Sequence, residues 1–200
     1  ITVYTACLVG CMFLNSFLKG PMSCFETLGI EFAESHFDMG RGAAGTTVAV
    51  VGLLGALSLL AMKMFITQYF DDIELITTGY TMFIIGILMN TLLDRNNPEN
   101  NPKWRYAISM FFCYSIGYPI CHVALIGLFS KVVGRKPQGT LLGLFASVGS
   151  TSRVLFPVLS GYIVRYRNIE TLFYLLASML AFSLMFVIIF RRVLRTLSST

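Results

Sequence analysis

The sharpest chemical signal in this sequence is a cation inside a long apolar stretch. Arg153 lies about fifteen residues into the segment 138–164, which carries no other charge. A charged side chain at the centre of a bilayer costs at least ~2.5–3.5 kcal/mol on insertion scales, so such residues face a cavity or pair with one another. Two interpretations stay open: a cavity-facing cation that attracts an anion, and a structural ion pair that locks helices together.

Glu26 is the candidate partner for this cation, because no other carboxylate precedes it in the first apolar segment. A half-buried glutamate can exchange protons, whereas a glutamate at a helix end is simply solvated. Lys19 lies seven residues earlier, and its long stem allows the ammonium either to line a pathway or to reach the membrane interface. Glu26 and Lys19 therefore join Arg153 as candidate pathway residues.

His122 is the fourth candidate, because it follows Pro119 inside another apolar segment. Its imidazole would titrate near the pH of an acidic compartment. The alternative is a histidine that is only hydrogen-bonded in the core. Glycine and proline interrupt the first and fourth apolar segments, at Gly20 and Pro21 and again at Gly117 and Pro119. Paired interruptions in equivalent helices of two repeats are typical of transporter binding sites.

The composition places these residues in an integral membrane protein. Of 200 residues, 56% are hydrophobic and 12% are charged, about half the charged fraction of soluble domains. The net charge of +5 lies in short loops and forms no stripe, which argues against nucleic acid as a partner. No catalytic or metal-ligand motif is present, so neither an enzyme nor a cofactor is predicted. The cysteines are expected to be small buried side chains: Cys7, Cys11, Cys24, Cys113 and Cys121.

The hydropathy pattern predicts an all-α fold with six transmembrane helices in a single domain, residues 1–200. At ~20 apolar residues per crossing, the spans are about 2–24, 43–68, 73–93, 106–129, 138–164 and 171–190. Helix continues from the first span towards Ala33, and a loop follows with Glu31, Glu34, His36, Asp38 and Arg41. Asn15 and Asn90 are expected to form hydrogen bonds between helices.

A basic loop precedes the fifth span and carries Lys131, Arg135, Lys136, Pro137, Gln138 and Gly139. Basic residues flank the spans most tightly in this loop and at Arg191–Arg195, so this side of the membrane is predicted to be cytoplasmic. The loop is expected to clamp neighbouring helix ends. In the span that follows, Gly139, Gly143, Ala146 and Ser150 form a stripe of small residues, which predicts a seam for close helix packing.

The stretch from Ile116 to Pro157 resembles the major facilitator superfamily. The resemblance rests on Gly117-Tyr118-Pro119, Ser130-Lys131, Gly134, Lys136-Pro137-Gln138-Gly139, Gly143, Ser147, Gly149-Ser150, Arg153 and Pro157. It implies helices seven to twelve, the C-terminal half of a twelve-helix transporter whose N-terminal six-helix half is the partner. It further implies a lysosomal or endosomal membrane, a cytosolic C-terminus, and transport of a small solute or anion by alternating access. The family's cytoplasmic G-x-x-x-D-R-x-G-R motif is replaced here by TQYFDDIEL, which implies a weakened or rewired clamp.

Two other functions stay open on the same residues. In an ion channel, Arg153 would select anions in an open path, and flux would not saturate as it does in a carrier. In a membrane protein that does not transport and serves only interactions, Arg153 would be a fully paired structural cation. Flux measurements separate these functions from the carrier.

Overall fold

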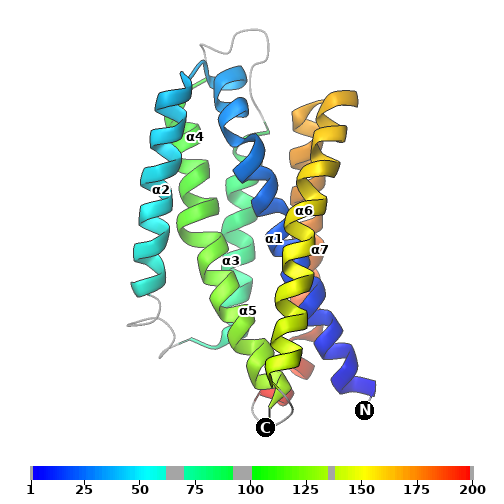
Figure 1. Ribbon diagram of the computed structural model, residues 1–200. Coiled ribbons are helices and arrows are strands. Elements are labelled where there is room, and N and C mark those ends of the chain that lie inside the picture. Colours follow the sequence, from blue (N-terminus) through cyan, green and yellow to red (C-terminus); the bar gives the residue numbers. More distant parts are fainter. Residues whose placement is uncertain (1, 62–69, 92–100, 135–137, 199–200) are drawn as a thin grey trace.

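The chain folds into a bundle of long helices that alternate in direction (Figure 1). The computed structural model describes residues 2–61, 70–91, 101–134 and 138–198. The elements are α1 (Thr2–Phe37), α2 (Arg41–Ala61), α3 (Asp72–Leu88), α4 (Lys103–Met110), the π-helical η3 (Phe111–Gly117), α5 (Tyr118–Val133), α6 (Gln138–Tyr166) and α7 (Ile169–Ser198). Since α4, η3 and α5 continue as one rod, six rods are present in the described residues, and both chain ends lie at the same end of the bundle.

Four of these rods are long and apolar enough to cross a membrane. They are Arg41–Ala61, Lys103–Val133, Gln138–Tyr166 and Ile169–Thr196. Within the part of the chain that is described, α1 and α3 do not reach the same standard, and α3 has only 17 residues. The predicted all-helical membrane architecture is therefore confirmed, and the prediction of six crossing helices is confirmed for four of them.

The first helix is longer than predicted and contains part of the predicted loop. Helix α1 continues to Phe37, so Glu31, Glu34 and His36 lie in its last turns, and the prediction of a loop there is wrong. The reason is that this segment is amphipathic: Phe25, Phe32 and Phe37 are buried at helical spacing while the charged residues face outwards. The chain then turns at Asp38, whose φ of 48° is tolerated by aspartate.

The core lies where α1, α3, α5 and α7 meet. Its largest fully buried side chains include Tyr80 and Phe83 of α3, Phe129 of α5 and Leu14 of α1. The hydroxyl of Tyr80 donates a hydrogen bond to the carbonyl of Leu14 at 2.8 Å. The predicted interhelical bonds are confirmed, since buried Asn15 donates to the Phe145 carbonyl and buried Asn90 to the Ser109 hydroxyl. The five cysteines are free and buried, as expected.

The rod formed by α4, η3 and α5 is called the central rod below. Helix α3 packs closely against it at two glycines. A Cβ added to Gly79 would lie 2.8 Å from the amide nitrogen of Cys121, and one added to Gly117 would lie 2.8 Å from that of Phe83. Backbone atoms cannot move aside as flexible side chains do, so both positions require glycine. The second predicted helix interruption coincides with this contact, because the π-helical η3 ends at Gly117, two residues before Pro119. Proline disrupts the hydrogen-bonding pattern of the preceding turn, which accounts for a change of helix type here.

The first predicted interruption is wrong. Helix α1 runs through Pro21 without a break. Gly20 serves packing instead: its Cβ position is 2.5 Å from the ring of Phe156, so the ring of α6 lies directly on the α1 backbone. The two Gly/Pro pairs are therefore not structurally equivalent.

The predicted packing seam on α6 is also wrong within this chain. Gly139, Gly143, Ala146 and Ser150 are exposed, and nothing lies within 4 Å of the Cβ positions of the two glycines. The face of α6 that packs on α1 is adjacent to this stripe and carries buried Phe145, Gly149 and Ser152. A small-residue stripe identifies a surface that permits close approach but does not identify the partner.

Candidate functional site

Helices α1 and α6 run in parallel and share a polar interface. The side-chain amide of Asn15 donates to the carbonyl of Phe145 at 2.7 Å, and further along both helices the hydroxyls of Ser16 and Ser152 are hydrogen-bonded to each other. Polar groups therefore line up along a helix pair that is otherwise apolar. Buried hydrogen bonds of this kind hold membrane helices in register.

The structure pairs Arg153 with Glu26 in this interface. Nη2 of Arg153 lies 3.0 Å from Oε1 and 3.4 Å from Oε2 of Glu26. The two side chains are 44% and 41% exposed, so the pair lies on the surface of the six-helix unit and not in its core. Arg153 is the sixteenth residue of the 29-residue α6, which places it at mid-membrane depth. Hydrocarbon is a poor solvent for ions, so a surface with this pair favours a water-filled cavity or a covering protein.

Lys19 lies about one helical turn before this pair along α6, and its ammonium has no partner among the described residues. It is the eighteenth residue of the 36-residue α1, and its side chain crosses α6 at Gly149. A Cβ on Gly149 would lie 2.7 Å from Cδ and 2.9 Å from Nζ of Lys19, so only glycine leaves room for this crossing. Among the described residues, none forms a hydrogen bond or ion pair with the ammonium. The alternative that the ammonium extends to the membrane interface does not fit this position.

The central rod contributes an aromatic wall beside these charges. The rings of Tyr118 and His122 stack with centroids 5.3 Å apart and planes 17° apart. His122 lies within electrostatic range of Lys19 and Arg153, and its Nδ1 is buried without a hydrogen-bond partner in the described structure. All four predicted pathway residues thus gather in one region. Tyr114 and Tyr118 also lie in electrostatic range of Arg153 and Glu26, and their spacing of four residues from each other and from His122 is the sequence signal that was missed.

The predicted basic loop does not join this region. Lys131 pairs with Asp72 at 2.6 Å, and the side chain of Gln138 donates to the carbonyl of Gly134 at 2.8 Å. Gly139 has open space around its Cβ position. Arg135, Lys136 and Pro137 lie outside the described residues. Lys131 therefore contacts the start of α3, whereas the bond of Gln138 stays within the loop, and the clamp stays a prediction.

Lys131 belongs to a larger ionic cluster at this end of the bundle. Arg195 lies 2.5 Å from Asp71 and 3.3 Å from Glu74, and Arg191 lies 3.3 Å from Glu74. The acids stand at the start of α3, whereas Lys131 and Arg195 stand in the last turns of α5 and α7, so these charges complement the helix dipoles. We call Asp71, Asp72, Glu74, Lys131, Arg191 and Arg195 the end cluster.

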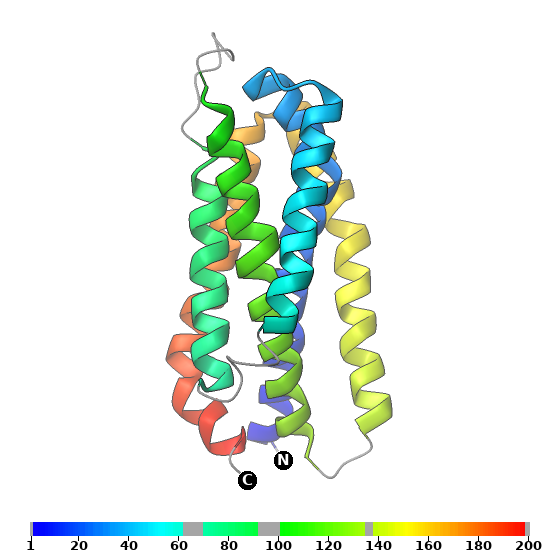
Figure 2. The same cartoon turned by 90° about the vertical axis from the view of Figure 1, so that its left-hand side faces the viewer.

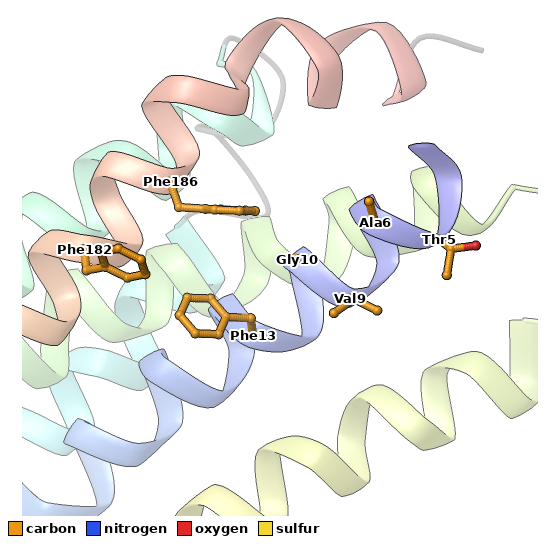
Figure 3. Close-up of a pocket in the computed structure, with 7 residues that line it drawn as sticks. All are labelled: Thr5, Ala6, Val9, Gly10, Phe13, Phe182 and Phe186. Carbon is orange, nitrogen blue, oxygen red and sulfur yellow. The ribbon is translucent and has the colours of Figure 1, made fainter. Parts of the chain in front are cut away.

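An apolar groove lies elsewhere, between the first turns of α1 and the middle of α7. Figure 3 shows its lining, which is Thr5, Ala6, Val9, Gly10, Phe13, Phe182 and Phe186. Apart from the Thr5 hydroxyl these residues offer no polar side chain, so the groove cannot orient a polar solute. The charged region between α1, α5 and α6 is the better candidate site.

Comparison with known proteins identifies the family. The sequence profile of the Major Facilitator Superfamily matches residues 5–200. The chain belongs to this superfamily. The membrane-length helices agree with this membership. The chain is also similar to the Xenopus laevis protein called major facilitator superfamily domain-containing protein 8, with 37% identity over 70 residues. That match covers 35% of this chain and 14% of the relative.

Proposed function

We propose that the chain is the C-terminal half of a transporter that moves a small solute or anion by alternating access, in a lysosomal or endosomal membrane with the C-terminus in the cytosol. The observation that carries the proposal is the Arg153–Glu26 pair at mid-helix depth with Lys19 beside it. Two cations against one carboxylate leave the region with one positive charge, which favours an anion over a cation. Family membership supports the transport class.

The partner of this unit is proposed to be an N-terminal six-helix half of the same transporter. Helices α2 and α6 are the least buried of the membrane-length helices. In each of them, 17% of the most apolar stretch of 18 residues is buried. Helix α2 lies at the left edge of the bundle in Figure 1, and α6 lies at the right edge in Figure 2. They expose apolar side chains such as Leu53 and Val154 as well as the small-residue stripe of α6. A second half that covers these helices would enclose the charged region, and the lipid bilayer would surround the rest.

Anion flux into vesicles that contain the complete protein tests this function. Wild type is compared with Arg153→Gln at a lumenal pH of about 5 and about 7, with protein level and thermal stability measured in parallel. We expect flux to fall about tenfold or more in the variant, because the region loses its surplus positive charge and Glu26 loses its ion-pair partner. Unchanged flux would contradict the proposal and favour the interaction protein.

The concentration dependence of the same flux separates a carrier from a channel. A carrier visits its site once per cycle, so its flux saturates with substrate concentration. A flux that rises linearly well beyond millimolar concentration would favour the anion channel, which uses the same charged region as an open path.

A further inference from the structure

Two cations lie in the candidate site, and they differ in whether a carboxylate is already paired with them. Both carboxylate oxygens of Glu26 lie within 3.4 Å of Nη2 of Arg153. The ammonium of Lys19 has no hydrogen-bond or ion-pair partner in the described residues. An anion that enters the site therefore meets one cation that is engaged and one that is available.

The position of Lys19 follows from the backbone of α6. Its Nζ lies 2.9 Å from the Cβ position of Gly149, and Gly149 and Arg153 stand one helical turn apart. Side chains at this spacing start about 5–6 Å apart on the same face. Arg153 is directed towards Glu26, which is seven residues beyond Lys19 on the parallel helix α1. The ammonium thus lies about one helical turn before Arg153 along α6.

A second group without a hydrogen-bond partner lies on the central rod. Nδ1 of His122 is buried without a hydrogen-bond partner in the described structure, and the ring is within electrostatic range of Lys19. Buried polar atoms without partners are rare in folded proteins and call for a ligand or water. An anion next to Lys19 would satisfy the ammonium and can accept a hydrogen bond from the imidazole.

We infer that Lys19, with His122 beside it, is the primary ligand of the transported anion, while Arg153 remains paired with Glu26 and sets the charge of the site. This inference rests on the proposed function and reverses the order of importance that the sequence indicates. Gly149 is then a positioning residue, because its missing side chain lets the ammonium reach the site. The ligand class is a singly charged anion, either a halide or a small carboxylate.

The test uses vesicles containing the complete protein, with chloride and acetate as the two probes. Lys19→Gln should raise KM tenfold or more with the maximal rate within about twofold, and Lys19→Arg should recover part of the affinity. The matched control is Lys103→Gln, which removes an exposed lysine at the far end of the central rod. The probe that saturates in wild type distinguishes a halide from a carboxylate ligand.

Rescue separates the two cations further. If Arg153 only balances Glu26, adding Glu26→Gln to Arg153→Gln should restore much of the flux that the single variant loses. If Arg153 holds the anion, the double variant stays inactive. An unchanged KM in Lys19→Gln together with failed rescue would overturn the inference and leave the proposed function standing.

If the wild-type protein transports neither anion, the proposed function fails. A measurement of anion binding then still tests the role of Lys19. The thermal midpoint of the purified wild-type protein should still rise by several degrees in saturating chloride or acetate. The same rise in Lys19→Gln, or no rise in wild type, would overturn the assignment of Lys19 as an anion ligand.

Discussion

Two groups of charged side chains in this molecule differ in how their charges are balanced. The end cluster combines three acids with three cations, and each member has an opposite charge within 3.3 Å. Among the described residues, the mid-membrane group combines the cations Lys19 and Arg153 with the carboxylate of Glu26, and of these two cations Arg153 is the paired one. The first group is electrically complete without a ligand, whereas the second is not.

The environments of the two groups make this difference meaningful. At the end of the bundle, water and lipid head groups screen charge, so a surplus there would cost little. At mid-membrane depth a surplus charge costs at least ~2.5–3.5 kcal/mol. A fold that keeps a costly unpaired lysine beside a satisfied ion pair is organised for something other than stability. We therefore propose that the end cluster tethers helices and that the mid-membrane group binds a ligand.

The largest expected effect comes from breaking one ion pair in each group. Arg153→Gln leaves Glu26 without a counter-charge in the membrane and should lower the free energy of unfolding by about 1–3 kcal/mol. Arg195→Gln leaves Glu74 paired with Arg191 and should cost less than about 1 kcal/mol. Thermal unfolding of both variants in detergent checks the difference. Equal effects would mean that the two environments are not distinct.

An intermediate effect is expected from two glycines of α6. Gly149→Ala places a Cβ 2.7 Å from Cδ of Lys19 and from the amide of Asn15. The lysine must move, so KM for the anion should rise about threefold or more and the thermal midpoint should fall by a few degrees. Gly143→Ala is the matched control, because nothing lies within 4 Å of its Cβ position.

The control variant Gly143→Ala is expected to change stability in the opposite direction. Alanine has a higher helix propensity than glycine, so in this six-helix unit Gly143→Ala should be neutral or stabilising by up to about 1 kcal/mol. A similar loss of stability in both variants would indicate that the exposed stripe is packed against the proposed second half. Flux kinetics and thermal unfolding, measured on the same preparations, separate these outcomes.

The sequence alone was enough to predict the features that depend on composition and on isolated charges. Membrane-length apolar segments follow directly from hydropathy, and the rarity of charge within them marks Arg153, Glu26, Lys19 and His122 without any structure. What could not be read from the sequence is which neighbour each residue meets. The Gly20–Pro21 pair resembles a helix break, but Phe156 of α6 packs on it and the helix continues.

The same limit explains the error about the small-residue stripe, and it explains why the position of the Lys19 side chain could not be read from the sequence. Gly149 and Ser150 are neighbours in the sequence, yet they lie on different faces of α6. Gly149 faces α1, whereas Ser150 faces outwards. The side chain of Lys19 lies across α6 because a glycine 130 residues away leaves room. The end cluster was missed for the same reason, since its acids and cations are separated by 59 to 124 residues in the chain.

The smallest expected effect is the one that tests the end cluster itself. Asp72→Asn removes the 2.6 Å contact with Lys131, whose side chain is 55% exposed, and should lower stability by less than about 1 kcal/mol. Because salt screens exposed charges over about 10 Å at 0.1 M, the difference from wild type should vanish in 1 M salt, while the destabilisation of Arg153→Gln should persist. Thermal midpoints at low and high salt measure both. If salt abolished the effect of Arg153→Gln as well, the mid-membrane pair would be as open to ions as the end cluster, and its unpaired lysine would no longer require a ligand.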